Sequence, residues 1–191
     1  MKYLLNAIFI FLNRSKIFVI SIAVTFVLAI IIIGWILPIN LEVYEIFKAN
    51  VLSYYNVAFC LEISVFEIFI KRLFTLALIL VVVLLLSLNK YTIYLNFIIV
   101  IFRGFLLGIA LKIFLLETLL VGFFTFLFLV FIESLFLVFS IALLISIIKY
   151  NQSNCEKTIL LKSYLFCLAV SVIGVIIECL LILTLFRLLN Y

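Results

Sequence analysis

The 191-residue chain contains no histidine and no aspartate, and only one proline. Their absence removes the usual imidazole base, most metal sites and any aspartate dyad. Cys60, Cys155, Cys167 and Cys179 form no C-x-x-C pair and lie in different predicted compartments, so we expect neither a disulfide nor a zinc site. Nucleotide-binding and hydrolase motifs are also lacking. The sequence argues against an enzyme, without excluding one, and predicts no cofactor and no metal.

What the chain has in abundance is apolar residues. Hydrophobic residues make up 71% of it, charged residues only 11%, and the mean hydropathy is +1.61. A water-soluble globule of this size needs more polar surface, so we predict an integral membrane protein with a single domain over 1–191. The net charge of +5 does not indicate a nucleic-acid partner, because most cations sit at the ends of predicted spans, where positive-inside sorting places them.

We predict an all-α, polytopic membrane bundle of about five transmembrane helices, with an interfacial outer helix and a kinked or re-entrant fourth segment. Segment 117–148 is too long for one perpendicular span and too short for two, and we place its break near Glu133 and Ser134. Aromatic residues and the i,i+4 pair Glu67 and Lys71 predict that 40–70 lies at the outer interface, either as a solvated connector or as a partner-docking platform. The five predicted spans are about 17–37, 73–88, 95–116, 117–148 and 164–187.

The distribution of lysine and arginine predicts the orientation. An excess of cations in the inner segments favours a cytoplasmic N-terminus and an outer C-terminus. Lys71 and Arg72 are expected to snorkel at the outer end of the second span. The outer segments hold Lys48, Lys71, Arg72 and Arg187, and the inner segments hold Lys2, Arg14, Lys16, Lys90, Lys149, Lys157 and Lys162.

Three charges fall inside predicted spans. Arg103 lies about eight residues, or ~12 Å, from the start of its span, and Glu133 and Glu178 approach the same depth. An ionised group at the centre of an inserted helix costs about 2.5 to 3.5 kcal/mol, and an unpaired buried charge costs more. We expect Arg103 to pair inside the bundle with Glu133, Glu178 or both. Two carboxylates for one guanidinium would allow one of them to be protonated.

Small and polar residues accompany these charges. Gly104 and Gly108 have the small-xxx-small spacing that lets helix backbones approach closely. Ser171, Gly174 and Glu178 share one helical face by their i+3 and i+4 spacing. These residues, with Ser134, are expected to serve helix packing and to line a cavity.

Three interpretations of the charges stay open at this stage. They form a purely structural ion-pair network, or a hydrophilic cavity that contacts a substrate or relays protons, or Arg103 snorkels to the inner headgroups and pairs with neither carboxylate.

The layout resembles the stage II sporulation protein M family of bacterial membrane proteins, over most of the chain from about Phe66. The resemblance rests on "FEIFIKRL" at the entry to the second span and on Arg103, Gly104 and Gly108 in the third. It also includes the polar interruption at Glu133 and Ser134 and the pair Ile177 and Glu178. The chain departs from the family pattern by carrying Lys71 and Arg72 where members often have asparagine, and by lacking the family's prolines in the fourth segment.

The resemblance implies a non-ATPase component of a multi-component complex in the bacterial cell membrane. One role is the maturation, export or immunity of a hydrophobic peptide resembling a circular bacteriocin, beside other membrane subunits and an ABC ATPase. The alternative is a non-catalytic scaffold that recruits cell-wall hydrolases, as in sporulation engulfment. The sequence identifies neither the substrate nor the partners nor the oligomeric state.

Overall fold

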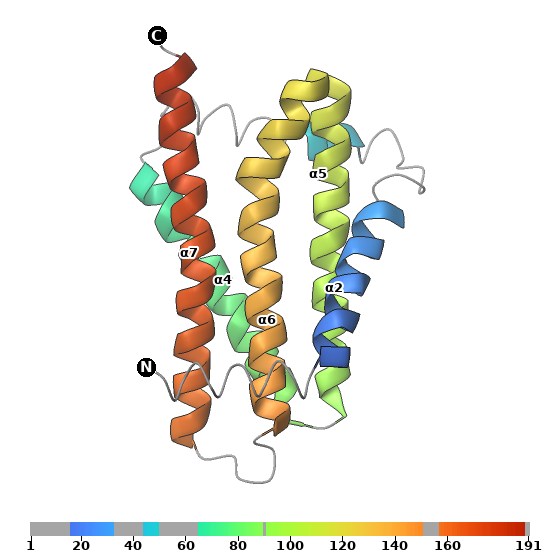
Figure 1. Cartoon of the computed structure of the whole chain (residues 1–191), viewed down its shortest axis with the longest axis vertical. Coiled ribbons are helices and arrows are strands. Elements are labelled where there is room, and N and C mark those ends of the chain that lie inside the picture. The colour runs from blue at the N-terminus through green and yellow to red at the C-terminus, as the bar shows by residue number, and fades with distance from the viewer. Residues whose placement is uncertain (1–15, 33–43, 50–64, 90, 151–156, 190–191) are drawn as a thin grey trace.

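The computed structural model describes residues 16–32, 44–49, 65–89, 91–150 and 157–189. Nearly all of them are helical and none of them is in a strand, which confirms the predicted all-α fold (Figure 1). Residues 44–49 form a short helix. The other elements are α2 (Lys16–Ile31), α4 (Val65–Ser87), the 3-10 turn η2 (Thr92–Leu95), α5 (Asn96–Thr125), the π-helical segment η3 (Phe126–Phe131), α6 (Ile132–Tyr150) and α7 (Lys157–Leu189).

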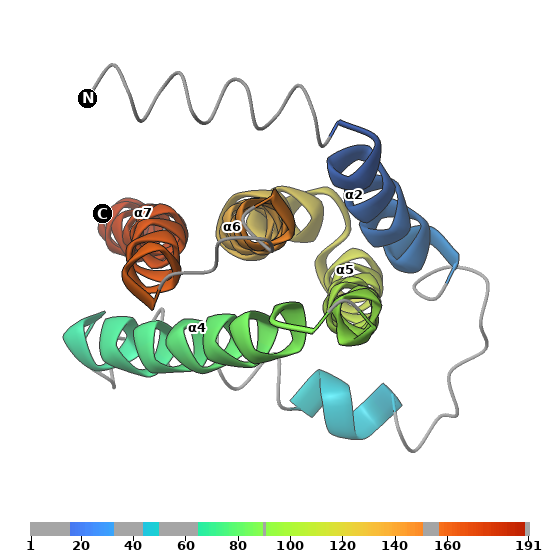
Figure 2. The same ribbon diagram turned by 90° about the horizontal axis from the view of Figure 1, so that it is seen from below.

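Helix α6 lies at the centre of the bundle. Seen from below, α7 and α2 flank it on two sides, and α4 runs along a third side, beside α7 and α6 (Figure 2). The most extensive contact is between α6 and α7, and α4 packs on both of them. Helix α5 packs mainly on α2, while its backbone makes little direct contact with α6 or α4. The bundle therefore consists of two groups, α4–α6–α7 and α2–α5, which meet through α2 against α6 and through η3.

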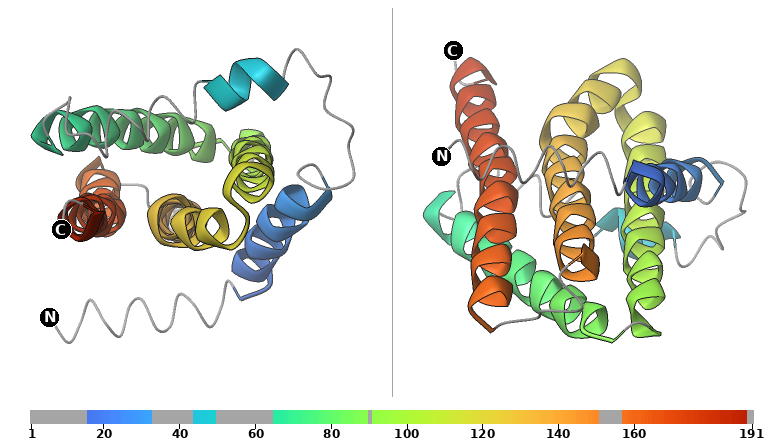
Figure 3. Two further views of the ribbon diagram at one scale, coloured as in Figure 1. Left: turned by 90° about the horizontal axis from the view of Figure 1, so that it is seen from above. Right: turned by 60° about the horizontal axis from the view of Figure 1, so that its bottom comes forward.

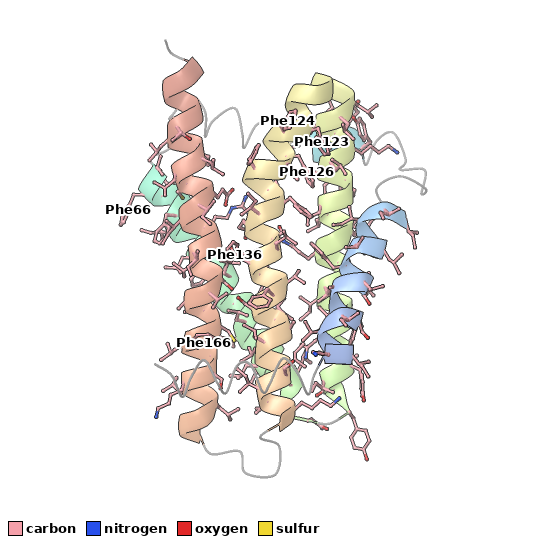
Figure 4. All side chains as sticks on the ribbon, in the orientation of Figure 1. Phe66, Phe123, Phe124, Phe126, Phe136 and Phe166 are labelled. Carbon is pink, nitrogen blue, oxygen red and sulfur yellow. The ribbon has the colours of Figure 1, made fainter. Side chains whose placement is uncertain are left out.

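Helix α4 is inclined to the other long helices, as two further views show (Figure 3). Among the four long apolar helices it is the least buried, and α6 is the most buried. Because α4 is little buried, aromatic and aliphatic side chains on it point away from the bundle. One of them is Phe66, which projects from the bundle and is 70% exposed (Figure 4). Such exposed apolar surface is stable only in lipid or against another apolar surface.

Four helices are long and apolar enough to cross a membrane, namely Val65–Ser87, Thr92–Leu116, Phe126–Lys149 and Leu160–Thr184. A shorter apolar helix covers Val19–Ile31, within the predicted first span 17–37, whose residues after 32 lie outside the described residues. A multi-pass membrane protein is therefore the class that the fold supports, while the number of five spans stays a prediction.

One end of the bundle collects cations. Helices α2 and α7 begin there and α6 ends there (Figure 1). The charged side chains that the structure describes at this end are those of Lys16, Lys149 and Lys162, with no carboxylate among them. We call it the lysine end. The positive-inside rule predicts that it faces the cytoplasm.

The connection between α4 and α5 at the lysine end is held by polar side chains. Asn96 is fully buried and its Nδ2 donates to Ser87 Oγ at 2.9 Å and to the Ile93 carbonyl at 3.0 Å. Ser87 Oγ in turn donates to the Val83 carbonyl, and Thr92 Oγ1 donates to the Leu86 carbonyl. These bonds supply partners to the backbone where the chain reverses, which the membrane interior demands.

Several helices are longer than the predicted spans. Helix α4 begins at Val65, so residues 65–70 are its first turns, and only 44–49 of the remaining 40–64 are described. Helix α5 continues past residue 116 to Thr125, and α7 begins at Lys157, before residue 164. Helices can continue beyond the hydrocarbon into the interfacial region, where charged residues are tolerated, so a span predicted from hydropathy is shorter than its helix.

The predicted irregularity of the fourth segment exists, but not at Glu133 and Ser134. It is the π-helical turn Phe126–Phe131, and Glu133 and Ser134 lie in the first turn of α6, both buried. The sequence misled us because a polar pair in an apolar run suggests a break. Here the glutamate has a cation to bond, so the helix does not need to break, and the irregular turn falls in an entirely apolar stretch instead.

Gly104 brings α2 and α5 into close contact. A β-carbon at this position would lie 2.7 Å from Ala29 Cβ and 2.9 Å from the Phe26 carbonyl oxygen. Both distances are shorter than real β-carbon contacts, and one of the two neighbours is backbone. Gly104 therefore sets the separation of the two helices, as its small-xxx-small spacing predicts, and Gly108 one turn later is also buried.

Gly104→Ala is accordingly expected to destabilise the fold by about 1 to 3 kcal/mol, because α2 must move away from α5. Denaturant titration in mild detergent measures this loss. Ala29→Gly in the same chain removes one of the two clashes and is expected to restore part of the stability. Equal stability of Gly104→Ala and the unsubstituted protein would show that the helices are not in close contact there.

Candidate functional site: a buried quartet of charges

Arg103 and Glu133 form an ion pair between α5 and α6. The Arg103 Nη2 atom donates to Glu133 Oε2 at 2.5 Å, and the side chains are 19% and 2% exposed. Ser134 Oγ donates to the same carboxylate oxygen at 3.2 Å. Because α5 and α6 make little backbone contact, only a side chain as long as arginine spans the distance between them. The predicted interior pairing of Arg103 is therefore present, and Glu133 is its partner.

Glu178 has a different partner. Arg72 Nη2 donates to Glu178 Oε1 at 3.2 Å, linking α4 to α7, and the side chains are 25% and 1% exposed. The expectation that Arg72 snorkels at the outer end of its span is therefore wrong. Since α4 begins at Val65, Arg72 lies two turns inside the helix, where it can turn inward. Lys71 beside it is exposed and bonds Glu67 at 2.8 Å, as predicted from their spacing.

The two ion pairs form one electrostatic cluster. Glu178 interacts through space with Glu133 and Arg103 as well as with Arg72. Gly174, one turn before Glu178, brings α7 against α6 at this level. A β-carbon there would lie 2.8 Å from Phe136 Cβ and 3.3 Å from the Glu133 α-carbon, and Figure 4 shows Phe136 between the two helices. We call Arg72, Arg103, Glu133 and Glu178 the charge quartet.

The quartet is balanced, with two guanidinium groups and two carboxylates. The sequence analysis counted one cation against two carboxylates, because it placed Arg72 at the surface, and so it allowed a proton on one carboxylate. The added cation removes that reason. Each carboxylate has its own guanidinium, which is the arrangement that low-dielectric surroundings favour.

Hydrogen bonding within the quartet is incomplete. Arg103 Nε and Glu178 Oε2 are buried, and neither has a hydrogen-bond partner among the described residues. Ser171 Oγ, two turns below Glu178 on the same face of α7, also lacks one, and its residue is 1% exposed. Buried polar atoms are usually bonded, so a donor and an acceptor left open beside two ion pairs call for an explanation.

Most sequence-predicted residues meet in the interior. Arg103, Glu133, Ser134 and Glu178 lie in or against the quartet, and Gly174 packs directly on Glu133. Gly104 and Gly108 serve a different contact, toward α2 in the case of Gly104. Ser171 is buried in the same stripe of α7, but no bond joins it to the charges. That these residues line a cavity stays a prediction.

Sequence reasoning missed Arg72 as a member of the quartet, and it gave no place to Lys112. Arg72 could have been found by extending the second span back to Val65, which places it at a depth that requires a partner. Lys112 lies on α5 between Leu107 and Leu116, half-buried and without an ion-pair partner among the described residues. Its position near one end of the apolar stretch Thr92–Leu116 suits snorkelling.

The quartet suits binding and positioning better than bond chemistry. The described residues contain no group of three or more cysteine or carboxylate side chains placed to hold a metal ion. Within the part of the chain that the structure describes, the hydroxyl bonded to a carboxylate of the quartet is that of Ser134, and the same Glu133 oxygen accepts from Arg103.

A double-mutant cycle tests the pairing. Arg103→Gln alone leaves Glu133 buried without its cation and is expected to destabilise the fold by about 3 to 5 kcal/mol. Adding Glu133→Gln removes the unpaired charge and should recover most of that loss, as measured by denaturant titration in detergent.

The same cycle between Arg103→Gln and Glu178→Gln is the control. Both residues belong to the quartet but do not bond, so their coupling is expected to be clearly weaker. A stronger coupling of Arg103 to Glu178 than to Glu133 would contradict the assignment.

Comparison with known proteins does not assign this chain to a family. No protein-family model, no curated protein and no solved structure matches this chain. The resemblance to the stage II sporulation protein M family therefore stays a prediction from the residues, and function has to be argued from the bundle itself.

Proposed function

We propose that this protein is a membrane-embedded subunit of a multi-component complex for the maturation, export or immunity of a hydrophobic peptide. The observation that carries the proposal is the charge quartet, buried where two groups of helices meet, with Arg103 Nε and Glu178 Oε2 left without hydrogen-bond partners. Ionisable residues in spans are costly, and they commonly mark the path of a substrate.

A peptide main chain carries the groups that the quartet lacks. A carbonyl oxygen could accept from Arg103 Nε, and an amide N–H could donate to Glu178 Oε2. An apolar peptide entering the bilayer has the same difficulty as the protein, because its main chain finds no water to bond. A polar interior enclosed by apolar helices therefore offers such a peptide a favourable place within the membrane.

The two-group architecture supplies a place for the interior to open. Helix α5 is joined to α6 across the bundle by the Arg103–Glu133 pair rather than by close backbone packing. Helix α4 is the least buried of the long helices and contacts α5 little. Separation of α4 or α5 from the central α6 would expose the quartet to a substrate without unfolding any helix.

The alternative, a scaffold that recruits cell-wall hydrolases, depends on the outer segment 40–70. Of this segment the structure describes 44–49 and 65–70, and the latter belong to α4. No observation on these residues favours a docking platform. The peptide-handling role is therefore the one that the described geometry supports.

Site-directed photocrosslinking in cells tests the proposal. Benzoylphenylalanine at Phe136, which lies against Gly174 beside the quartet, is expected to crosslink a small apolar peptide. The matched control is benzoylphenylalanine at Phe139, three residues further along α6 and 43% exposed on the outside, where at most about a tenth of the yield is expected.

A variant without the Arg103–Glu133 pair then separates substrate binding from folding. The double substitution Arg103→Gln with Glu133→Gln removes this pair without leaving an unpaired charge and retains the Arg72–Glu178 pair, and it should abolish both the crosslink at Phe136 and peptide maturation or export. Arg103→Leu alone should abolish them as well. Wild-type export by the double variant at normal protein levels, or crosslinking that is equal at both phenylalanines, would refute the peptide-handling role.

A further inference from the structure

A groove on the outside of the bundle is unrelated to the charge quartet. It has a volume of about 290 Å³ and is lined by Val81 and Leu84 of α4 and by Leu160, Leu161 and Tyr164 of α7. Leu84 is three residues from the end of α4 and Leu160 three from the start of α7, or about 5 Å at 1.5 Å per residue. The groove therefore opens at the lysine end, just inside the predicted membrane boundary.

Its walls offer no free polar group. Tyr164 is the only lining residue with a polar side-chain atom, and its hydroxyl donates to the Ala77 carbonyl of α4 at 3.2 Å. This bond holds the ring in place as one wall of the groove. The outer rim is apolar and open, with Leu161 60% exposed and Val81 37% exposed.

The chemistry of the walls selects the occupant. An extended peptide segment would bring main-chain N–H and C=O groups that nothing in the groove can bond, and such groups are costly at this depth. Water is unsuited for the converse reason, because an apolar site gives it no partners. A saturated or monounsaturated acyl chain has no polar group along its length and fits such walls.

Charge selects the headgroup. The exposed Lys162 follows the groove residue Leu161 directly on α7, at the lysine end. Lysines next to a span on one side of the membrane attract anionic lipid, at about 1 kcal/mol for each cation near the surface. A lipid whose chain enters the groove from this end places its phosphate in that positive field.

We propose that the groove between α4 and α7 binds an acyl chain of an anionic phospholipid whose headgroup lies at the lysine end. The lipid would fill the space that opens where the inclined α4 diverges from α7 below the Tyr164–Ala77 bond. This inference is independent of the peptide-handling role, since it uses neither the quartet nor the interior.

The test uses the full chain purified in mild detergent and stripped of lipid. It is titrated with phosphatidylglycerol or with phosphatidylcholine of the same acyl chains, and bound lipid is counted by native mass spectrometry. The unsubstituted protein is expected to hold one phosphatidylglycerol, with phosphatidylcholine bound at least about tenfold more weakly.

Two matched pairs of variants locate the site. Leu161→Trp fills the groove and should weaken phosphatidylglycerol binding at least about tenfold, whereas Leu165→Trp, one turn along α7, 52% exposed and outside the groove, should bind normally. Val81→Trp and the control Val82→Trp repeat the comparison on α4 and keep the test decisive if one variant fails to fold.

Equal binding by Leu161→Trp and Leu165→Trp, or by Val81→Trp and Val82→Trp, would overturn the site. Equal binding of the two lipids would overturn the anionic headgroup. Release of an apolar peptide instead of lipid by Leu161→Trp would show that the groove has another occupant and would likewise overturn the proposal.

Discussion

The need to neutralise charge inside hydrocarbon governs this bundle. Arg103 and Glu133 come from helices whose backbones hardly touch, and Arg72 and Glu178 come from the least buried long helix and the last one. An ion exposed to the bilayer interior costs several kcal/mol, so each of these side chains is stable only where its partner is. Any arrangement that slid one of these four helices by a turn would separate the pair to which it contributes. The quartet therefore fixes the register of four helices that apolar packing alone, equally satisfied by lipid, would leave loosely specified.

Glycine residues complete this constraint by letting the charge carriers approach. Gly174 allows α7 to contact Phe136 and the backbone of Glu133, one turn from Glu178. Gly104 follows Arg103 directly and holds α2 against the opposite side of α5. In each case a residue without a side chain lies within a turn of a residue with a long charged one. Close backbone contact on one face of a helix thus positions a charged side chain on another face, where it reaches across a wider gap to its partner helix.

Composition was sufficient to predict the class of fold, and the i+3 and i+4 spacing of Ser171, Gly174 and Glu178 was sufficient to identify a buried face of α7. Charge in a run of apolar residues correctly identified Arg103, Glu133 and Glu178 as interior residues, because no other location is stable for them. Which carboxylate bonds Arg103 could not be predicted, since both lie at a similar depth and the choice depends on how the helices are arranged around α6. The interior position of Arg72 was missed because the second span was predicted to begin at residue 73, whereas α4 begins at Val65. The π-helical turn Phe126–Phe131 has no sequence signature at all, because every residue in it is apolar.

Both proposed sites include residues of α4, but their proposed ligands differ in polarity. At the quartet α4 contributes Arg72. Separation of α4 from α7 would uncover the ionised Arg72 and Glu178, and this separation is favourable only if a polar main chain replaces the partner that each has lost. At the groove α4 contributes Val81 and Leu84, and the space beside them gains nothing from polar contact and is best filled by an acyl chain. The Tyr164–Ala77 hydrogen bond lies between the two regions and ties α4 to α7 at that level. Helix α4 packs on α6 and α7 and is joined to α7 by one ion pair and, further along, one hydrogen bond. The two proposed functions are therefore separable by position along a single helix.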